Sequence, residues 1–275
     1  MTYADAEIDS AGPPNRTPVR WWQRPWIAPL AFLIVVFMTF SLPPYLSLDP
    51  SRSRVPAPSG FPLHYPLLVL HVICGSIALG CVVFQIWPWF RNHHRTAHRR
   101  IGRTYVLAGV LPGGLAGLIL AATTPFGPVI KVSSVMMALL WLGITLTGFV
   151  MARRGRFVEH RRWMIRSFAL TCSIILNRFV AVAVFLVLQP QQNTIFAGNE
   201  TWFVQVTAGI TGWLSWTVAL LLAEWWLERR PYPADRDTPR LVSVSAIANL
   251  QQQSAATKAQ PGGGGRDYSR LARHE

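Results

Sequence analysis

Polar side chains interrupt two of the long apolar runs in this chain, and their chemistry stands out. His71 and Gln85 are separated by a multiple of seven residues, so they point to the same side of one helix. Another run carries the adjacent pair Asn177 and Arg178, and at about 1.5 Å per residue Arg178 is expected near the depth of His71. A membrane-buried arginine costs about 2.5 to 3.5 kcal/mol and needs a partner or a wet cavity. The sequence therefore predicts either a small intramembrane polar site formed by His71, Gln85, Asn177 and Arg178 or a purely structural network.

Two basic boxes begin at His98 and His160 and read HRRIGRTYVL and HRRWMIRSFAL. One inserted residue aligns them, which is consistent with an internal duplication or with chance similarity. Arginine offers paired donors that match phosphate, so we expect these boxes to contact anionic lipid headgroups or a phosphorylated ligand. The alternative is that they only fix the orientation of the protein in the membrane. The candidate contacts are His98, Arg99, Arg100, Arg103, His160, Arg161, Arg162 and Arg166.

A b-type haem is an alternative ligand for the intramembrane site. His71 would be the iron ligand, Gly75 would make room for the flat ring, and Arg178 would neutralise a propionate. The second axial ligand is missing from this hypothesis, because His64 lies on the same helix and the box histidines lie at the other membrane surface. The sequence leaves open whether any cofactor binds.

Several kinds of catalytic site are not expected. No acidic residue lies between Asp49 and Glu159, and Glu224 is the only carboxylate in the last two predicted spans. Paired-carboxylate catalysis and carboxylate-coupled ion transport therefore lack their groups. Zinc-protease, nucleophile-elbow and P-loop patterns are also missing. An enzyme is the less favoured class, and a small-molecule transporter is a further alternative.

The apolar runs predict membrane spans, because about 20 apolar residues cross a hydrocarbon core about 30 Å thick. We expect an all-α, polytopic integral membrane protein with six transmembrane helices, of which spans two to five form a four-helix core. Gly109, Gly113 and Gly117 form a small-residue pattern that predicts close helix packing. The predicted membrane domain covers residues 26–227, with spans at about 26–42, 65–89, 104–124, 132–152, 167–189 and 203–222.

The distribution of charge predicts the orientation. The net charge is +14, and the arginines gather at the ends of the apolar runs, which points to a lipid surface and not to nucleic acid. The segment between spans two and three and the one between spans four and five hold the boxes. Both should face the cytoplasm, which places both termini there. Residues 1–25 and the tail 228–275 have compositions typical of disorder.

The order of several residues resembles the bacterial membrane-protein family catalogued as domain of unknown function 2306. The resemblance covers roughly residues 64–180 and implies a multi-span protein of the bacterial inner membrane with no assigned activity. Its main positions are His71, Gly75, Ala78, Gln85, Arg91, His98, Arg99, Gly102, Arg103, Tyr105, Trp141, His160, Arg161, Trp163, Met164, Arg166, Ser167, Thr171 and Arg178.

Overall fold

The computed structural model describes residues 25–58, 60–229 and 252. The chain divides into two units, residues 1–229 and residues 230–275, and only Gln252 of the second unit is described. The expected disorder of residues 1–25 and 228–275 therefore falls almost entirely outside the described residues. The following description concerns the first unit alone.

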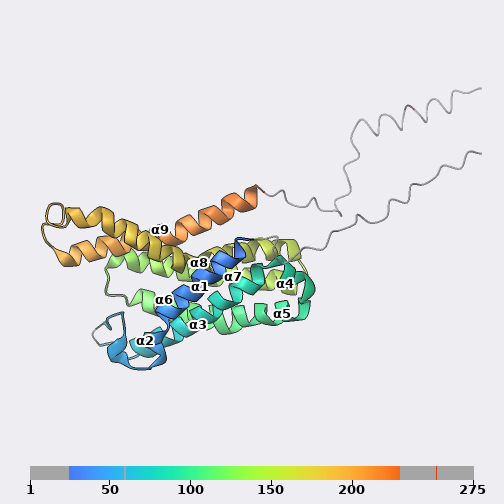
Figure 1. Cartoon of the computed structure of the whole chain (residues 1–275), viewed down its shortest axis with the longest axis horizontal. Coiled ribbons are helices and arrows are strands. Elements are labelled where there is room, and N and C mark those ends of the chain that lie inside the picture. The colour runs from blue at the N-terminus through green and yellow to red at the C-terminus, as the bar shows by residue number, and fades with distance from the viewer. Residues whose placement is uncertain (1–24, 59, 230–251, 253–275) are drawn as a thin grey trace, which may run out of the picture. The chain divides into compact units, whose positions relative to one another are not determined.

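Five helices are long and apolar enough to cross a membrane. Together with the helical segments that extend them, they confirm the predicted all-α, multi-span fold, and no strand occurs among the residues described (Figure 1). In chain order they are α3 (His64–Ile86), the continuous helix of α5 (Arg95–Thr104), η2 (Tyr105–Val110) and α6 (Leu111–Ala122), then α7 (Pro128–Arg153), α8 (Phe157–Leu188) with η3 (Gln189–Gln191), and α9 (Glu200–Glu228).

The first predicted span is shorter than the other five. It forms α1 (Ile27–Ser41), whose 15 residues cover about 22 Å at about 1.5 Å per residue, less than the core thickness of about 30 Å. Two prolines follow, and a short helix α2 (Pro43–Leu46) continues the chain before the 3-10 turn η1 (Pro50–Arg52). The count of six spans is therefore approximate, because only five helices in the part of the chain that the structure describes have the full length.

The basic boxes are helical, which lengthens two of the predicted spans. Span three was expected to begin at residue 104 and span five at residue 167, whereas the helices begin at Arg95 and Phe157. Arginine is a good helix former, so a polar composition does not end a helix where it leaves the apolar core. Both boxes therefore stand on helices continuous with the membrane-spanning segments.

Glycines let α3 and the α5–α6 helix lie close together, as their spacing predicts. A Cβ added at Gly109 would lie 2.9 Å from the Cβ of Ala78, and one at Gly113 would lie 3.0 Å from the Cβ of Cys74. A Cβ at Gly117 would lie 2.8 Å from the His71 ring. A side chain at Gly109 would press against the Ala78 backbone, and one at Gly113 or Gly117 would require Cys74 or the His71 ring to shift.

The core lies where the long helices meet in the middle of the bundle. Ala78 of α3, Tyr105 of η2 and Leu170 of α8 are exposed by 1% or less. The same cluster includes Ile34 of α1 and Trp216 of α9, and the Trp216 indole donates to Ser133 Oγ of α7 at 3.0 Å. The first and last helices therefore pack onto the bundle formed by the central spans.

Candidate functional site

The two basic boxes lie at the same end of the bundle, which we call the basic end and define as residues 88–104 and 153–166. It comprises α4 (Pro88–His93), α5, the end of α7 and the first turns of α8 (Figure 1). These ranges hold five and six arginines, respectively, and Glu159 is their single acid. The basic end therefore carries a large excess of positive charge.

Two side chains tie the boxes to the helices that precede them. Gln85 Nε2, near the end of α3, donates to the His98 carbonyl at 2.9 Å. His160 Nδ1 lies 2.8 Å from the Gly148 carbonyl of α7 and so donates to it. Gly102 packs against the Gln85 amide, where an added Cβ would lie 3.4 Å from Gln85 Oε1. The sequence placed Gln85 in the intramembrane polar site, whereas the structure places it beside the first box.

The two boxes lie close enough for their positively charged groups to affect one another. Burial, and then the positive charge of Arg161, lower the pKa of the Arg91 guanidinium from its usual value. His98 in turn interacts electrostatically with Arg91 and with His160. His98 Nδ1 is buried and has no hydrogen-bond partner within the described part of the chain. Arginines gathered around one position, as they are here, are suited to an anionic ligand.

Not all box arginines are available to such a ligand. The Arg166 guanidinium forms a two-point ion pair with Glu224 of α9, at 2.5 and 2.8 Å, and lies over the Trp163 ring. Arg162 is half-buried and has an interaction partner. The exposed arginines of the boxes are Arg99, Arg100, Arg103 and Arg161.

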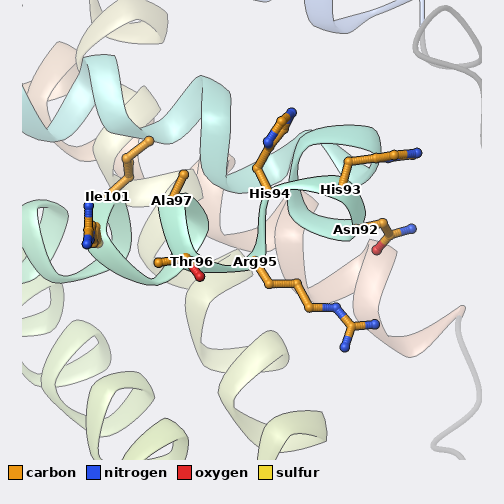
Figure 2. A pocket seen from close by; sticks show the side chains of 8 residues that line it. Asn92, His93, His94, Arg95, Thr96, Ala97 and Ile101 are labelled. Atoms are coloured by element: carbon orange, nitrogen blue, oxygen red, sulfur yellow. The ribbon is translucent and has the colours of Figure 1, made fainter.

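An open hollow of about 690 Å³ lies where α4 meets α5, and His93, His94, Arg95 and Arg100 are among the residues that line it. Figure 2 shows the His94 ring and the Arg95 guanidinium pointing to opposite sides of the chain, so the hollow has no closed wall of charge. We call it the basic hollow. Its open shape suits a headgroup at a membrane surface better than an enclosed small molecule.

The structure does not bring His71, Asn177 and Arg178 to one site. His71 Nδ1 lies 2.8 Å from the Gly113 carbonyl of α6. Asn177 Nδ2 donates to Ser215 Oγ of α9 at 3.1 Å, and the Arg178 guanidinium lies 5.7 Å from the centre of the Phe37 ring of α1. Each side chain therefore contacts a different helix.

Haem binding has no structural support. Arg178 lies against α1 and not beside His71, and the box histidines lie at the basic end. The contact that His71 does make is the one to α6, which serves helix packing.

A buried cluster of hydroxyl groups is a feature that sequence reasoning missed. Tyr105 OH lies 2.6 Å from Ser167 Oγ and 2.7 Å from Thr171 Oγ1. Thr145 Oγ1 lies 2.6 Å from Ser167 Oγ, and the Trp141 indole donates to Thr171 Oγ1 at 2.9 Å. All five side chains are exposed by 7% or less. We call these five residues the hydroxyl cluster, and they link η2, α7 and α8.

The spacing of the hydroxyl cluster was the signal available in the sequence. Trp141 and Thr145 lie one helical turn apart, as do Ser167 and Thr171, so each pair shares a face. The alignment of the two boxes pairs Thr104 with Ser167, but their surroundings differ. Thr104 is exposed and its hydroxyl donates a hydrogen bond to the Arg100 carbonyl, whereas Ser167 is fully buried. The aligned hydroxyls thus have different roles.

Comparison with known proteins identifies the family but no activity. No curated protein and no solved structure matched the chain. Residues 68–227 match the family described as "Predicted membrane protein (DUF2306)", which includes most of the described helices and both boxes. The chain therefore belongs to this family of predicted multi-span membrane proteins, domain of unknown function 2306.

Proposed function

We propose that this membrane protein binds the phosphate of an anionic phospholipid at its basic end. The observation that carries the proposal is the imbalance of charge there: eleven arginines and a single acid within residues 88–104 and 153–166. That acid, Glu159, pairs with Arg156 of the same turn and leaves the exposed box arginines to other partners. Arginine binds phosphate through paired donors, and a surface cluster of this kind attracts anionic lipid.

The placement of the arginines favours a lipid over a soluble phosphorylated ligand. Both boxes extend helices that cross the membrane, so Arg99, Arg103 and Arg161 stand at the depth of lipid headgroups. By the positive-inside rule, the basic end faces the cytoplasm, in a bacterial inner membrane with both termini on that side. No contact among the described residues supports the two other hypotheses, small-molecule transport and haem-based electron transfer.

The test compares two triple variants that remove the same charge from opposite ends. The first changes Arg99, Arg100 and Arg103 to Gln. The control changes Arg52, Arg54 and Lys131 to Gln at the other end of the bundle. Retention of dioleoyl phosphatidylglycerol and of dioleoyl phosphatidylcholine by the purified proteins is measured by native mass spectrometry.

Each surface arginine contributes about 1 kcal/mol to the binding of anionic lipid, so the first variant should bind phosphatidylglycerol roughly a hundredfold more weakly. The control should match the wild type. An equal loss of lipid binding in both variants would mean that binding depends on net charge alone and not on the basic end. A wild type with no preference between the two lipids would overturn the proposal. A soluble glycerol phosphate that competes as well as the intact lipid would point to a phosphorylated small molecule instead.

A further inference from the structure

A second hollow, of about 490 Å³ and almost wholly apolar, lies between the first helices and α3. We call it the apolar groove. α1, its C-cap and α2 contribute Met38, Leu42 and Leu46, and α3 contributes Ile73, Ile77 and Phe84. Gly80 forms part of the floor, and a Cβ added there would meet no other atom within 4 Å. The groove is therefore kept open by the missing side chain at this position.

The apolar groove and the basic hollow meet at one residue. Ile101 of α5 lines both. The groove ends at Phe84, two residues before the end of α3, and the last residues of α4, Asn92 and His93, line the basic hollow. Positive charge at one end of an apolar groove is the complement of an anionic amphiphile.

The length of the groove matches one leaflet of a bilayer. Ile73 and Phe84 are eleven residues apart on α3. At about 1.5 Å per residue they are about 16 Å apart, close to half of a hydrocarbon core about 30 Å thick. A single acyl chain that starts at the headgroup level would therefore run the length of the groove and end near the bilayer centre.

We propose that the apolar groove between α1 and α3 holds one acyl chain of the anionic phospholipid whose phosphate binds at the basic hollow. This inference rests on the proposed function, and it adds that the lipid is held at a defined site rather than as part of a diffuse layer. Ile101 lies at the junction, where the glycerol backbone of the lipid would cross from one hollow to the other.

Gly80→Leu is the direct test, because Gly80 lines the groove and a Cβ added there meets no other atom within 4 Å, so a leucine side chain would extend into the groove. Gly143→Leu is the matched control. Gly143 lies in the middle of α7, a Cβ there also meets nothing within 4 Å, and it lies outside the groove. Both substitutions add the same apolar volume to a helix, so their effects on helix propensity cancel in the comparison.

The full-length wild type and both variants are purified in mild detergent with a defined mixture of phosphatidylglycerol and phosphatidylcholine, and retained lipid is counted by native mass spectrometry. We expect Gly80→Leu to retain about tenfold less phosphatidylglycerol, which corresponds to about 1.4 kcal/mol, and Gly143→Leu to match the wild type. Thermal unfolding of the delipidated proteins checks that both variants are folded.

The possible outcomes separate the two proposals. If the wild type prefers phosphatidylglycerol and Gly80→Leu retains it equally well, the groove does not hold the chain, while the basic end still binds the headgroup. If Gly80→Leu loses phosphatidylglycerol and phosphatidylcholine alike and the wild type shows no preference, the groove binds a chain and the headgroup proposal fails. An equal loss in Gly143→Leu would overturn the inference, because the effect would then not depend on the groove.

Discussion

The hydroxyl cluster gives the sharpest prediction about stability. Thr171 donates to the Ser167 carbonyl at 2.8 Å, which fixes the direction of the other bonds. Thr145 then donates to Ser167, Ser167 to Tyr105, and Tyr105 to Thr171, so that every hydroxyl donates once. Tyr105→Phe removes this hydroxyl and its two bonds, while Ser167 keeps the bond from Thr145 and Thr171 keeps the bond from the Trp141 indole.

The expected cost follows from the two bonds lost. Hydrogen bonds between membrane helices are worth about 0.6 kcal/mol on average and about 1.7 at most. Tyr105 is 1% exposed, so no solvent can replace its hydroxyl, and we expect the free energy of unfolding to fall by about 1 to 3 kcal/mol. Reversible unfolding in lipid–detergent mixtures with increasing dodecyl sulfate measures this change.

Tyr65→Phe is the matched control for this prediction. The Tyr65 hydroxyl is buried, and it has no hydrogen-bond partner in the part of the chain that the structure describes. Removing this hydroxyl should leave the free energy of unfolding unchanged or raise it, because a buried hydroxyl without a hydrogen bond costs desolvation energy and contributes no bond. Ser167→Ala combined with Tyr105→Phe should cost less than the sum of the two single changes, since they share a bond. An equal loss for Tyr65→Phe and Tyr105→Phe would refute the reasoning.

Three further predictions test the fold. Single cysteines at Asn193 and Ala97, in a background without native cysteines, should react with impermeant maleimide from opposite sides of the membrane, and labelling from one side would contradict the topology. Gly109→Val should destabilise the bundle by about 1 to 3 kcal/mol in the same unfolding assay, because its Cβ would lie 2.9 Å from the Cβ of Ala78. Gly75→Val should cost far less, because a Cβ at Gly75 meets nothing within 4 Å. Glu224→Gln should cost about 1 kcal/mol or less, since both partners of its ion pair are partly exposed, and no additional cost should follow when Arg166→Gln is combined with it.

The spans were predictable because length and hydropathy are properties of single segments. The helix boundaries at the boxes were not, because a window that counts arginine as polar stops at the membrane surface while the helix continues to Arg95 and Phe157. The spacing of Gly109, Gly113 and Gly117 predicted close packing correctly, because small residues four positions apart let a neighbouring helix approach closely.

The polar contacts were harder to predict, because they depend on which helix faces which. Equal depth suggested that His71 and Arg178 meet, yet depth does not fix rotation about the helix axis, and the two side chains reach α6 and α1. The hydroxyl cluster was missed because serine, threonine and tyrosine carry no charge and are common in apolar helices. Arg166 was grouped with the other box arginines, although its partner Glu224 lies on a helix far along the chain.

The π-helical segment Tyr105–Val110 has a consequence for how insertions and deletions affect this chain. A π turn holds one residue more than the α-helix that surrounds it, so it shifts the rotational phase between α5 and α6 by about 100°, the angle of a single residue. Deleting one residue within it would restore a regular α-helix, and the backbone would tolerate the change. Because the π turn accommodates this extra residue, Arg99 and Arg103 would stay on the same face of the helix after the deletion. A residue deleted from a regular α-helix would instead turn the two ends relative to each other by about 100°, so the π turn marks the place where this helix can lose a residue without turning its charged face.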